Sequence, residues 1–343
     1  MTSDDRAAAT HGATTAAATT AAATTAAATT AEAGPAPAQV KSVLVVGAGA
    51  MGRQIAMLCA LAGIDTRCHD VDPARLGLAT DELLAWAQRQ LDRGRLEPAD
   101  RDAAFSRLAF TRALDESAAD VDVVIEAVVE KLDVKRDLFA RLGGLAPRRT
   151  ILASNSSSFV PWTMADASGR PDRFVNLHFF NPALVMKCVE VVPGPSTAPR
   201  TTATVAALAE RLGKTAVILE AEIPGFVANR ILNAVRDEAI SLLEKGIAGV
   251  EAIDVICRTA LGYPMGPFEL MDLTGIDIGY LTKTARFAQT GNPADAPSAS
   301  VSRLVERGEL GRKTGRGWYL YDGATRIGMN PAAGPTNTHP GGN

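Results

Sequence analysis

The sequence predicts an α/β fold: a doubly wound sheet with a helical insertion, followed by a second domain made only of helices. Three observations favour this class. An apolar, strand-like run leads directly into a glycine-rich turn and a helix near residue 42. Strand-like runs and helical patterns then alternate as far as about residue 222. From residue 223 onward helical periodicity dominates, interrupted by Gly- and Pro-containing breaks.

The composition excludes several classes of protein. A chain of 343 residues is long enough for two domains with separate cores. Its net charge of −3 provides no basic field that would attract nucleic acid. No apolar run approaches the ~20 residues of a membrane span. The four cysteines are scattered without a C-x-x-C pair, so we expect reduced thiols, a cytoplasmic location and no metal site.

Changes in composition divide the chain into four predicted segments. Residues 1–38 are dominated by Ala and Thr and are predicted to be a disordered leader. Residues 39–222 are predicted to form a nucleotide-binding domain, and residues 223–323 a helical domain for substrate binding and dimerisation. Residues 324–343, which are rich in Gly, Pro, Asn and Thr, are predicted to be a flexible tail.

The strongest motif is a glycine-rich turn, Gly-Ala-Gly-Ala-Met-Gly, at residues 47–52 between the first strand and its helix. This is the context that the dinucleotide fingerprint G-x-G-x-x-G of Rossmann-type domains requires. The first glycine permits the tight turn, the second lets the backbone approach a pyrophosphate, and the third allows close helix packing. The helix N-terminus offers free N–H groups to the phosphates. The predicted cofactor contacts are Gly47, Gly49, Ala50, Met51 and Gly52.

An acidic residue follows at the distance that the fingerprint predicts. Asp70 ends the second predicted strand, 18 residues after Gly52. A carboxylate there binds the adenosine-ribose hydroxyls and repels the extra phosphate of NADP, so the predicted cofactor is NAD. Two helical patterns, at about residues 74–93 and 98–107, then lengthen the crossover. Their arginines, Arg93 among them, form either a solvated face or a contact for an anionic tail such as that of coenzyme A.

Polar residues follow two further predicted strands. Glu130 and Lys135 come after the strand at residues 122–130, and Asn155-Ser-Ser-Ser158 follows the strand at residues 150–154. Ligands of doubly wound sheets bind at the carboxyl ends of strands, so these residues are candidates for cofactor contacts. Glu126 and Glu130 have a second interpretation, because either could simply cap or pair.

Two polar residues interrupt apolar strands in the second informative stretch. His178 lies in the strand before Phe-Phe-Asn181-Pro, and Glu190 lies in the next apolar strand, 12 residues later. A buried carboxylate is costly unless it is paired, so we expect the two side chains to contact each other. The carboxylate would then fix one imidazole nitrogen and leave the other free to exchange a proton with substrate.

With these residues in view, the chain resembles the 3-hydroxyacyl-CoA dehydrogenase family in its short, 3-hydroxybutyryl-CoA form. The resemblance runs from about residue 40 to residue 322. It rests on ordered motifs: GAGAMGRQIA, VIEAVVEKLDVKRDLF, ASNSSS, RFVNLHFFNPALVMKCVEVV, PGFVANR, GYPMGPFELMDLTGID and LGRKTGRGWY.

The resemblance implies a reaction and roles for single residues. The reaction is NAD-dependent oxidation of a (3S)-3-hydroxyacyl-CoA thioester, or the reverse reduction, in a homodimer formed through the helical domain. His178 corresponds to the general base and Glu190 to the acid that orients it. Ser157 corresponds to the serine that bonds the reacting oxygen. The resemblance also implies that Asn229 helps to hold the substrate and the histidine, that Asp70 binds the adenosine ribose, and that Glu130, Lys135 and Asn155 lie around the nicotinamide half of the cofactor. Asn181 and Arg93 are further candidates for substrate binding.

Three alternatives remain at this point. The same hydride chemistry could act on a hydroxyacyl group bound to a carrier protein. A 3-hydroxyacid dehydrogenase would place a lysine on the first long helix of the second domain, where this sequence has Asn229. A non-catalytic NAD-binding protein would not need His178 and Glu190, and both are present.

Overall fold

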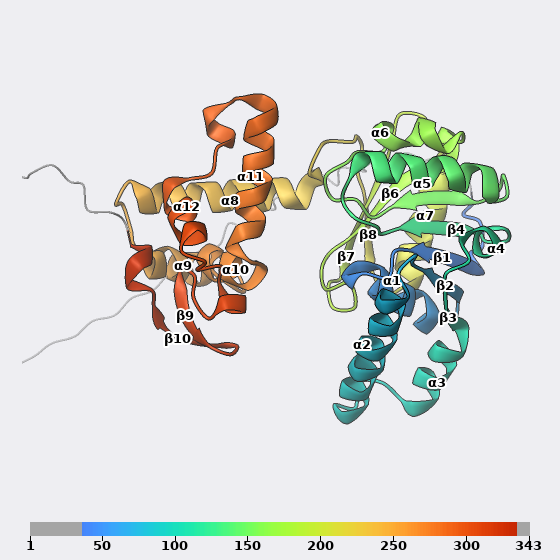
Figure 1. Cartoon of the computed structure of the whole chain (residues 1–343), viewed down its shortest axis with the longest axis horizontal. Helices are drawn as coiled ribbons and strands as arrows, with labels where there is room; N and C mark the ends of the chain where they lie inside the picture. Colours follow the sequence, from blue (N-terminus) through green and yellow to red (C-terminus); the bar gives the residue numbers. More distant parts are fainter. Residues whose placement is uncertain (1–35, 335–343) are drawn as a thin grey trace, which may run out of the picture.

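The first part of the chain forms an eight-stranded sheet with helices on both faces (Figure 1). The structure is a computed structural model that describes residues 36–334. The strand order is β3-β2-β1-β4-β5-β6-β7-β8, and neighbouring strands are parallel except for the antiparallel pair β6 and β7. The doubly wound α/β class predicted from the sequence is confirmed. The strands are β1 (Ser42–Val46), β2 (Asp65–His69), β3 (Leu108–Thr111), β4 (Val123–Glu126), β5 (Ile151–Ser154), β6 (Phe174–Phe179), β7 (Cys188–Pro193) and β8 (Thr215–Ile218).

Side chains of alternate residues in each strand pack into two cores, one on each face of the sheet. In β1, Val43 and Val45 join the core beneath α1, α2, α3 and α7. Leu44 and Val46 join the core beneath α4, α5 and α6. This period of two is what a strand covered on both faces requires. The helices are α1 (Ala50–Leu61), α2 (Pro73–Asp92), α3 (Pro98–Arg107), α4 (Leu114–Ala118), α5 (Leu132–Leu145), α6 (Trp162–Ala165) and α7 (Pro199–Arg211).

The glycine-rich turn between β1 and α1 needs two of its glycines for steric reasons. Gly47 has a φ of 108°, and a Cβ there would lie 2.5 Å from the carbonyl oxygen of Ala127. A Cβ on Gly52 would lie 1.7 Å from the carbonyl oxygen of Gly47. The turn can therefore close only with glycine at both positions.

The predicted helical insertion is the pair α2 and α3, which projects away from the sheet (Figure 1). Asp72 accepts a hydrogen bond from the N–H group of Ala74, and Pro73 occupies the first turn, so the start of α2 follows standard capping chemistry. The N-terminal part of α2 packs on the sheet core through Ala79 and Leu83. The helical arm formed by α2 and α3 is thus anchored to the sheet through α2.

The second part of the chain is mainly helical and begins with α8, which starts beside the sheet and runs away from it (Figure 1). Its helices α10 and α11 are separate because Gly275 between them has a φ of 99° and ends the first. Five helices make up most of this part: α8 (Phe226–Glu244), α9 (Val250–Thr259), α10 (Pro267–Thr274), α11 (Ile276–Thr290) and α12 (Ala299–Glu306).

A two-stranded hairpin closes the second part and corrects the prediction of a flexible tail from residue 324. Strand β10 (Thr325–Met329) pairs with β9 (Tyr319–Asp322) in antiparallel fashion. Beyond it, buried Asn330 donates from its amide group to the carboxylate of Glu309 and to the carbonyl oxygen of Gly317. These bonds fix a segment whose Gly- and Asn-rich composition resembles that of a loop. Residues 335–343 and most of the predicted leader lie outside the described residues.

None of the helices within residues 36–334 is both long enough and apolar enough to cross a bilayer.

Candidate active site

Polar side chains gather where β4, β5 and β6 end. Glu126 is the last residue of β4, and it lies opposite Ser154, the last residue of β5. Ser154 in turn lies opposite Asn176 of β6, two residues before His178. Because these strands are parallel, their carboxyl ends meet at one edge of the sheet. The sequence order of the motifs thus becomes a spatial cluster.

His178 and Glu190 contact each other across the antiparallel pair β6 and β7. The two residues are direct register partners, and His178 Nδ1 lies 2.8 Å from Glu190 Oε2. Both residues are buried. Within the described residues the imidazole has no second hydrogen-bond partner. The pairing expected from two buried polar residues is therefore present, and Nε2 remains available for proton exchange.

Glu190 is held by the second part of the chain as well as by His178. Its Oε1 atom accepts hydrogen bonds from the backbone N–H groups of Val227 and Ala228, at 3.1 and 2.9 Å, in the first turn of α8. Burial alone would raise the pKa of Glu190. The bonds from His178 and from the two N–H groups outweigh burial and hold the pKa below its ordinary value. The carboxylate therefore stays ionised beside the imidazole.

Two aromatic rings fix the imidazole from the sides. Phe180 makes an edge-on contact with His178 at a centroid distance of 4.7 Å, and Phe226 lies at 5.3 Å. Phe226 is fully buried and has a φ of 45°, a left-handed conformation that costs a non-glycine residue energy. Phe226 is not among the site residues predicted from the sequence, although it lies in the motif PGFVANR, directly after a Pro-Gly pair.

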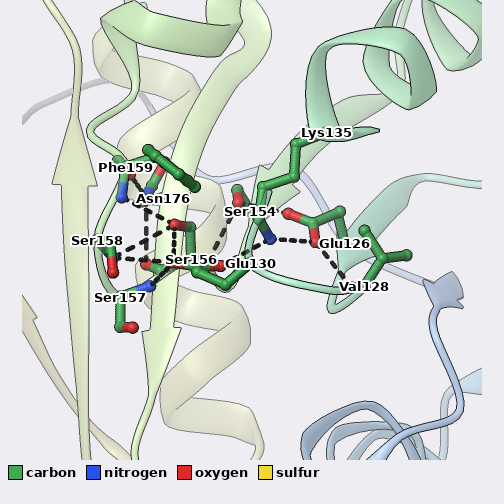
Figure 2. Close-up of polar contacts among 10 residues, drawn as sticks. All are labelled: Glu126, Val128, Glu130, Lys135, Ser154, Ser156, Ser157, Ser158, Phe159 and Asn176. Carbon is green, nitrogen blue, oxygen red and sulfur yellow. Dashed lines mark hydrogen bonds and ion pairs between the residues drawn. The ribbon is translucent and has the colours of Figure 1, made fainter. Parts of the chain in front are cut away.

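The serine turn after β5 is bound by Glu130 (Figure 2). Glu130 Oε1 accepts hydrogen bonds from Ser156 Oγ at 2.5 Å and from the N–H groups of Ser157 and Ser158 at 3.1 and 3.0 Å. Burial would raise the pKa of Glu130, but the Lys135 ammonium and these hydrogen bonds hold it below its ordinary value. An ionised carboxylate thus shapes the backbone that carries Ser157.

Family models match the chain on both sides of the change from sheet to helices. The model described as 3-hydroxyacyl-CoA dehydrogenase, NAD binding domain, matches residues 42–223, and the C-terminal domain of the same family matches residues 225–321. The chain belongs to the 3-hydroxyacyl-CoA dehydrogenase family. Membership makes it an NAD-dependent dehydrogenase, and the resemblance and the cofactor expected from the motifs are confirmed.

Relatives of this family span nearly the whole described chain. A probable 3-hydroxybutyryl-CoA dehydrogenase of Bacillus subtilis is 37% identical over 287 residues, which are 84% of this chain and 99% of the relative. The human mitochondrial hydroxyacyl-coenzyme A dehydrogenase is 38% identical, over 82% of this chain and 91% of the relative. The crystal structure of (S)-3-hydroxybutyryl-CoA dehydrogenase PaaH1 from Ralstonia eutropha is similar, with a TM-score of 0.77 and 34% identity, over 83% of this chain and all of that one.

The residues at the glycine-rich turn fit the NAD of this dehydrogenase family. A Cβ added at Gly49 would have no heavy atom within 4 Å, so the backbone is open on that side. Gly49 is the N-cap of helix α1, which has no side-chain cap and no acidic residue in its first turn. An uncapped helix N-terminus is a site for an anionic pyrophosphate. Asp70, directly after β2, accepts a hydrogen bond from the N–H group of Ala48, which lies in the glycine-rich turn.

Of the other site residues predicted from the sequence, one is bonded next to His178 and one is not connected to the polar cluster. The amide oxygen of Asn155 accepts a hydrogen bond from the N–H group of Phe179, next to His178. Asn229 is partly buried in the first turn of α8, and Asn181 is exposed after β6. Arg93 is exposed at the far end of α2, and no hydrogen bond or ion pair of the described residues joins it to the cluster.

Proposed function

We propose that this protein interconverts short-chain (3S)-3-hydroxyacyl-CoA and 3-oxoacyl-CoA thioesters, such as 3-hydroxybutyryl-CoA and acetoacetyl-CoA. The observation that carries the proposal is the buried His178–Glu190 pair, whose Nε2 atom has no hydrogen-bond partner among the described residues. The relatives named for 3-hydroxybutyryl-CoA support the short acyl chain.

NAD supplies the acceptor for the hydride that leaves C3. In the oxidative direction His178 Nε2 takes the proton from the 3-hydroxyl group, and the imidazole becomes positively charged. Glu190, ionised and 2.8 Å away, stabilises that charge and keeps the proton of the neutral ring on Nδ1. Ser157 donates a hydrogen bond to the reacting oxygen, and Asn229 holds the substrate beside the histidine.

The remaining contacts extend the proposal to the rest of both ligands. Asp70 binds the adenosine ribose of the cofactor, while Glu130, Lys135 and Asn155 lie at its nicotinamide half. Arg93 on the helical arm binds the anionic tail of coenzyme A. Exposed Asn181, after β6, faces the acyl thioester.

The second half of the proposal concerns assembly. We assign residues 39–222 to cofactor binding and residues 223–323 to substrate binding and dimerisation. Large apolar side chains are exposed on α8, α9 and α11, and such patches mark protein interfaces; they include Ile231, Ile256, Ile278 and Leu281. The supported assembly is a homodimer, and light scattering after size exclusion tests it. The four cysteines are unpaired thiols, which supports a cytoplasmic location.

The deciding experiment follows NADH absorbance with purified protein and acetoacetyl-CoA, with NADPH and with the His178→Gln variant as comparisons. We expect rapid oxidation of NADH, little of NADPH, and collapse of the rate in the variant. If NADPH works better, the role of Asp70 is wrong. If folded protein binds NADH but does not turn over the CoA thioester, the substrate is instead a carrier-protein thioester, and the same assay with that thioester shows it.

A further inference from the structure

A buried network of charged and hydroxyl groups lies behind the serine turn, and we call it the Glu126 network (Figure 2). Neither Glu126 nor Ser154 is exposed at all, and Lys135 and Ser156 are each 1% exposed. Glu130, at its outer edge, is partly exposed. Its members are Glu126, Glu130, Lys135, Ser154 and Ser156.

Glu126 is the innermost group, and both of its oxygens are used. Oε1 accepts hydrogen bonds from Lys135 Nζ at 2.5 Å and from the N–H group of Val128 at 2.8 Å. Oε2 accepts one from Ser154 Oγ at 2.6 Å. A carboxylate buried this completely persists only when it is paired and hydrogen-bonded. Glu126 therefore fixes the ammonium of α5 relative to the ends of β4 and β5.

Lys135 connects Glu126 to the serine turn through Glu130. Its Nζ atom also lies 3.0 Å from Glu130 Oε2, while Glu130 Oε1 binds Ser156 and the N–H groups of Ser157 and Ser158. The ammonium thus bridges one fully buried carboxylate and one that faces the site. Without a negative charge at Glu126, Lys135 would keep Glu130 as its one ionic partner in the network, and the position of Glu130 would be less firmly fixed.

We propose that Glu126 is a positioning residue, which acts through Lys135 and Glu130 to hold the backbone at residues 156–158 and so to place the Ser157 hydroxyl. The proposal rests on the proposed function, in which Ser157 bonds the reacting oxygen. Glu126 makes no hydrogen bond with the Ser157 hydroxyl or with His178. Its effect on the reaction therefore passes through the residues that it positions, and the proposal assigns that effect to Ser157.

A double-mutant cycle tests that route. Glu126→Gln keeps the side-chain volume and one acceptor but removes the charge that orders Lys135. We expect kcat for acetoacetyl-CoA reduction to fall about tenfold, as for other coupled polar networks. In a Ser157→Ala background the same change should lower kcat less than about threefold. If the loss of kcat in the double variant equals the product of the losses in the two single variants, the proposal is wrong.

A second measurement needs no activity. Amide hydrogen exchange in the peptide covering residues 155–160 reports the N–H groups of Ser157 and Ser158 that Glu130 binds. We expect faster exchange there in Glu126→Gln and unchanged exchange in the segment around β1. Equal exchange in the variant and the wild type would refute the positioning role. If the wild type fails to oxidise NADH, the proposed function fails, and this measurement still decides the role of Glu126.

Two further variants guard against a purely structural effect. Glu309→Gln alters another buried glutamate, which binds Asn330 in the second part of the chain, and it should leave kcat and exchange at residues 155–160 unchanged. If Glu126→Gln does not fold, Ser154→Ala replaces it, because it removes the hydroxyl that donates to Glu126 and accepts from the Ser156 N–H group, and it leaves the charges in place. Ser154→Ala should then show the same dependence on Ser157, and independence would count against the proposal.

Discussion

Replacing Glu190 by glutamine disturbs the centre of the site with almost no change in volume. Glu190 accepts hydrogen bonds from three donors: His178, Val227 and Ala228. Glutamine offers one acceptor oxygen and one NH₂ group. If its oxygen keeps the two N–H groups of α8, the NH₂ group faces His178 Nδ1 and drives the ring proton onto Nε2. In that tautomer the imidazole cannot take a proton from substrate.

The size of the effect follows from this geometry. In the Ser-His-Asp triad the equivalent loss of the orienting carboxylate lowers kcat about 10⁴-fold through the wrong tautomer. We therefore expect kcat of Glu190→Gln to fall about 10³- to 10⁴-fold, or roughly 4–5.5 kcal/mol in activation free energy. If the amide flips, it faces the two N–H groups of α8 with a donor, and the loss appears as a lower Tm instead.

The assay is NADH oxidation with acetoacetyl-CoA between pH 5.5 and 9, alongside NADH binding and thermal unfolding. NADH binding should persist, because Glu190 is not among the residues at the glycine-rich turn. A variant that unfolds at the wild-type temperature and retains more than a tenth of wild-type kcat would refute the reasoning. It would show that the carboxylate does not select the tautomer.

Three other perturbations have definite expected results. Gly52→Ala would place its Cβ 1.7 Å from a backbone carbonyl oxygen and should destabilise the fold by about 1–3 kcal/mol. Gly49→Ala should instead leave Tm unchanged and weaken NADH binding about tenfold. Thermal unfolding measures the first effect, and fluorescence titration with NADH measures the second. Buried Asp272 of α10 accepts hydrogen bonds from the N–H groups of Trp318 and Tyr319 and from the Tyr321 hydroxyl. Asp272→Asn should therefore cost about 2–4 kcal/mol in chemical unfolding, because a buried amide cannot accept from all three donors. The pKa values of Glu130 and Glu190 lie below their ordinary value of 4.5. Their contribution to stability is therefore present above about pH 4.5 and is lost as the pH falls further. Burial raises the pKa of Asp272 to about 6, so the pH dependence of its contribution has the opposite sign: stability is lost as the pH rises from about 4 to 6. Unfolding of the wild type and of Asp272→Asn across pH 3–7 measures both slopes.

Much of the fold could be predicted because its signals are local. The turn at residues 47–52 needs glycine at two positions for reasons that act within a few residues. The pairing of His178 with Glu190 was predictable too, since two polar residues on successive buried strands have few other ways to satisfy each other. Helix α3 has the predicted bounds, because proline begins it and a strand follows at once.

What could not be predicted depends on contacts between distant residues. The donors from α8 to Glu190 lie 37 and 38 residues further along the chain, and no local pattern indicates them. The sequence indicates Glu126 only as one polar residue at the end of a strand. Its place in the buried network depends on Lys135, which lies on the next helix. Strand β10 is fixed by Asn330 and its bonds across the domain, so composition alone misassigned it.

The bonds from α8 to Glu190 also limit how such a protein can evolve by recombination. An exchange between β8 and α8, where strands give way to helices, would keep the dinucleotide fold but leave Glu190 with one of its three donors. A newly joined helical partner would have to supply two N–H groups and a buried ring in the places of Val227, Ala228 and Phe226. The unit that holds Glu190 beside His178 therefore extends into the first turn of α8, and a viable crossover point lies beyond it.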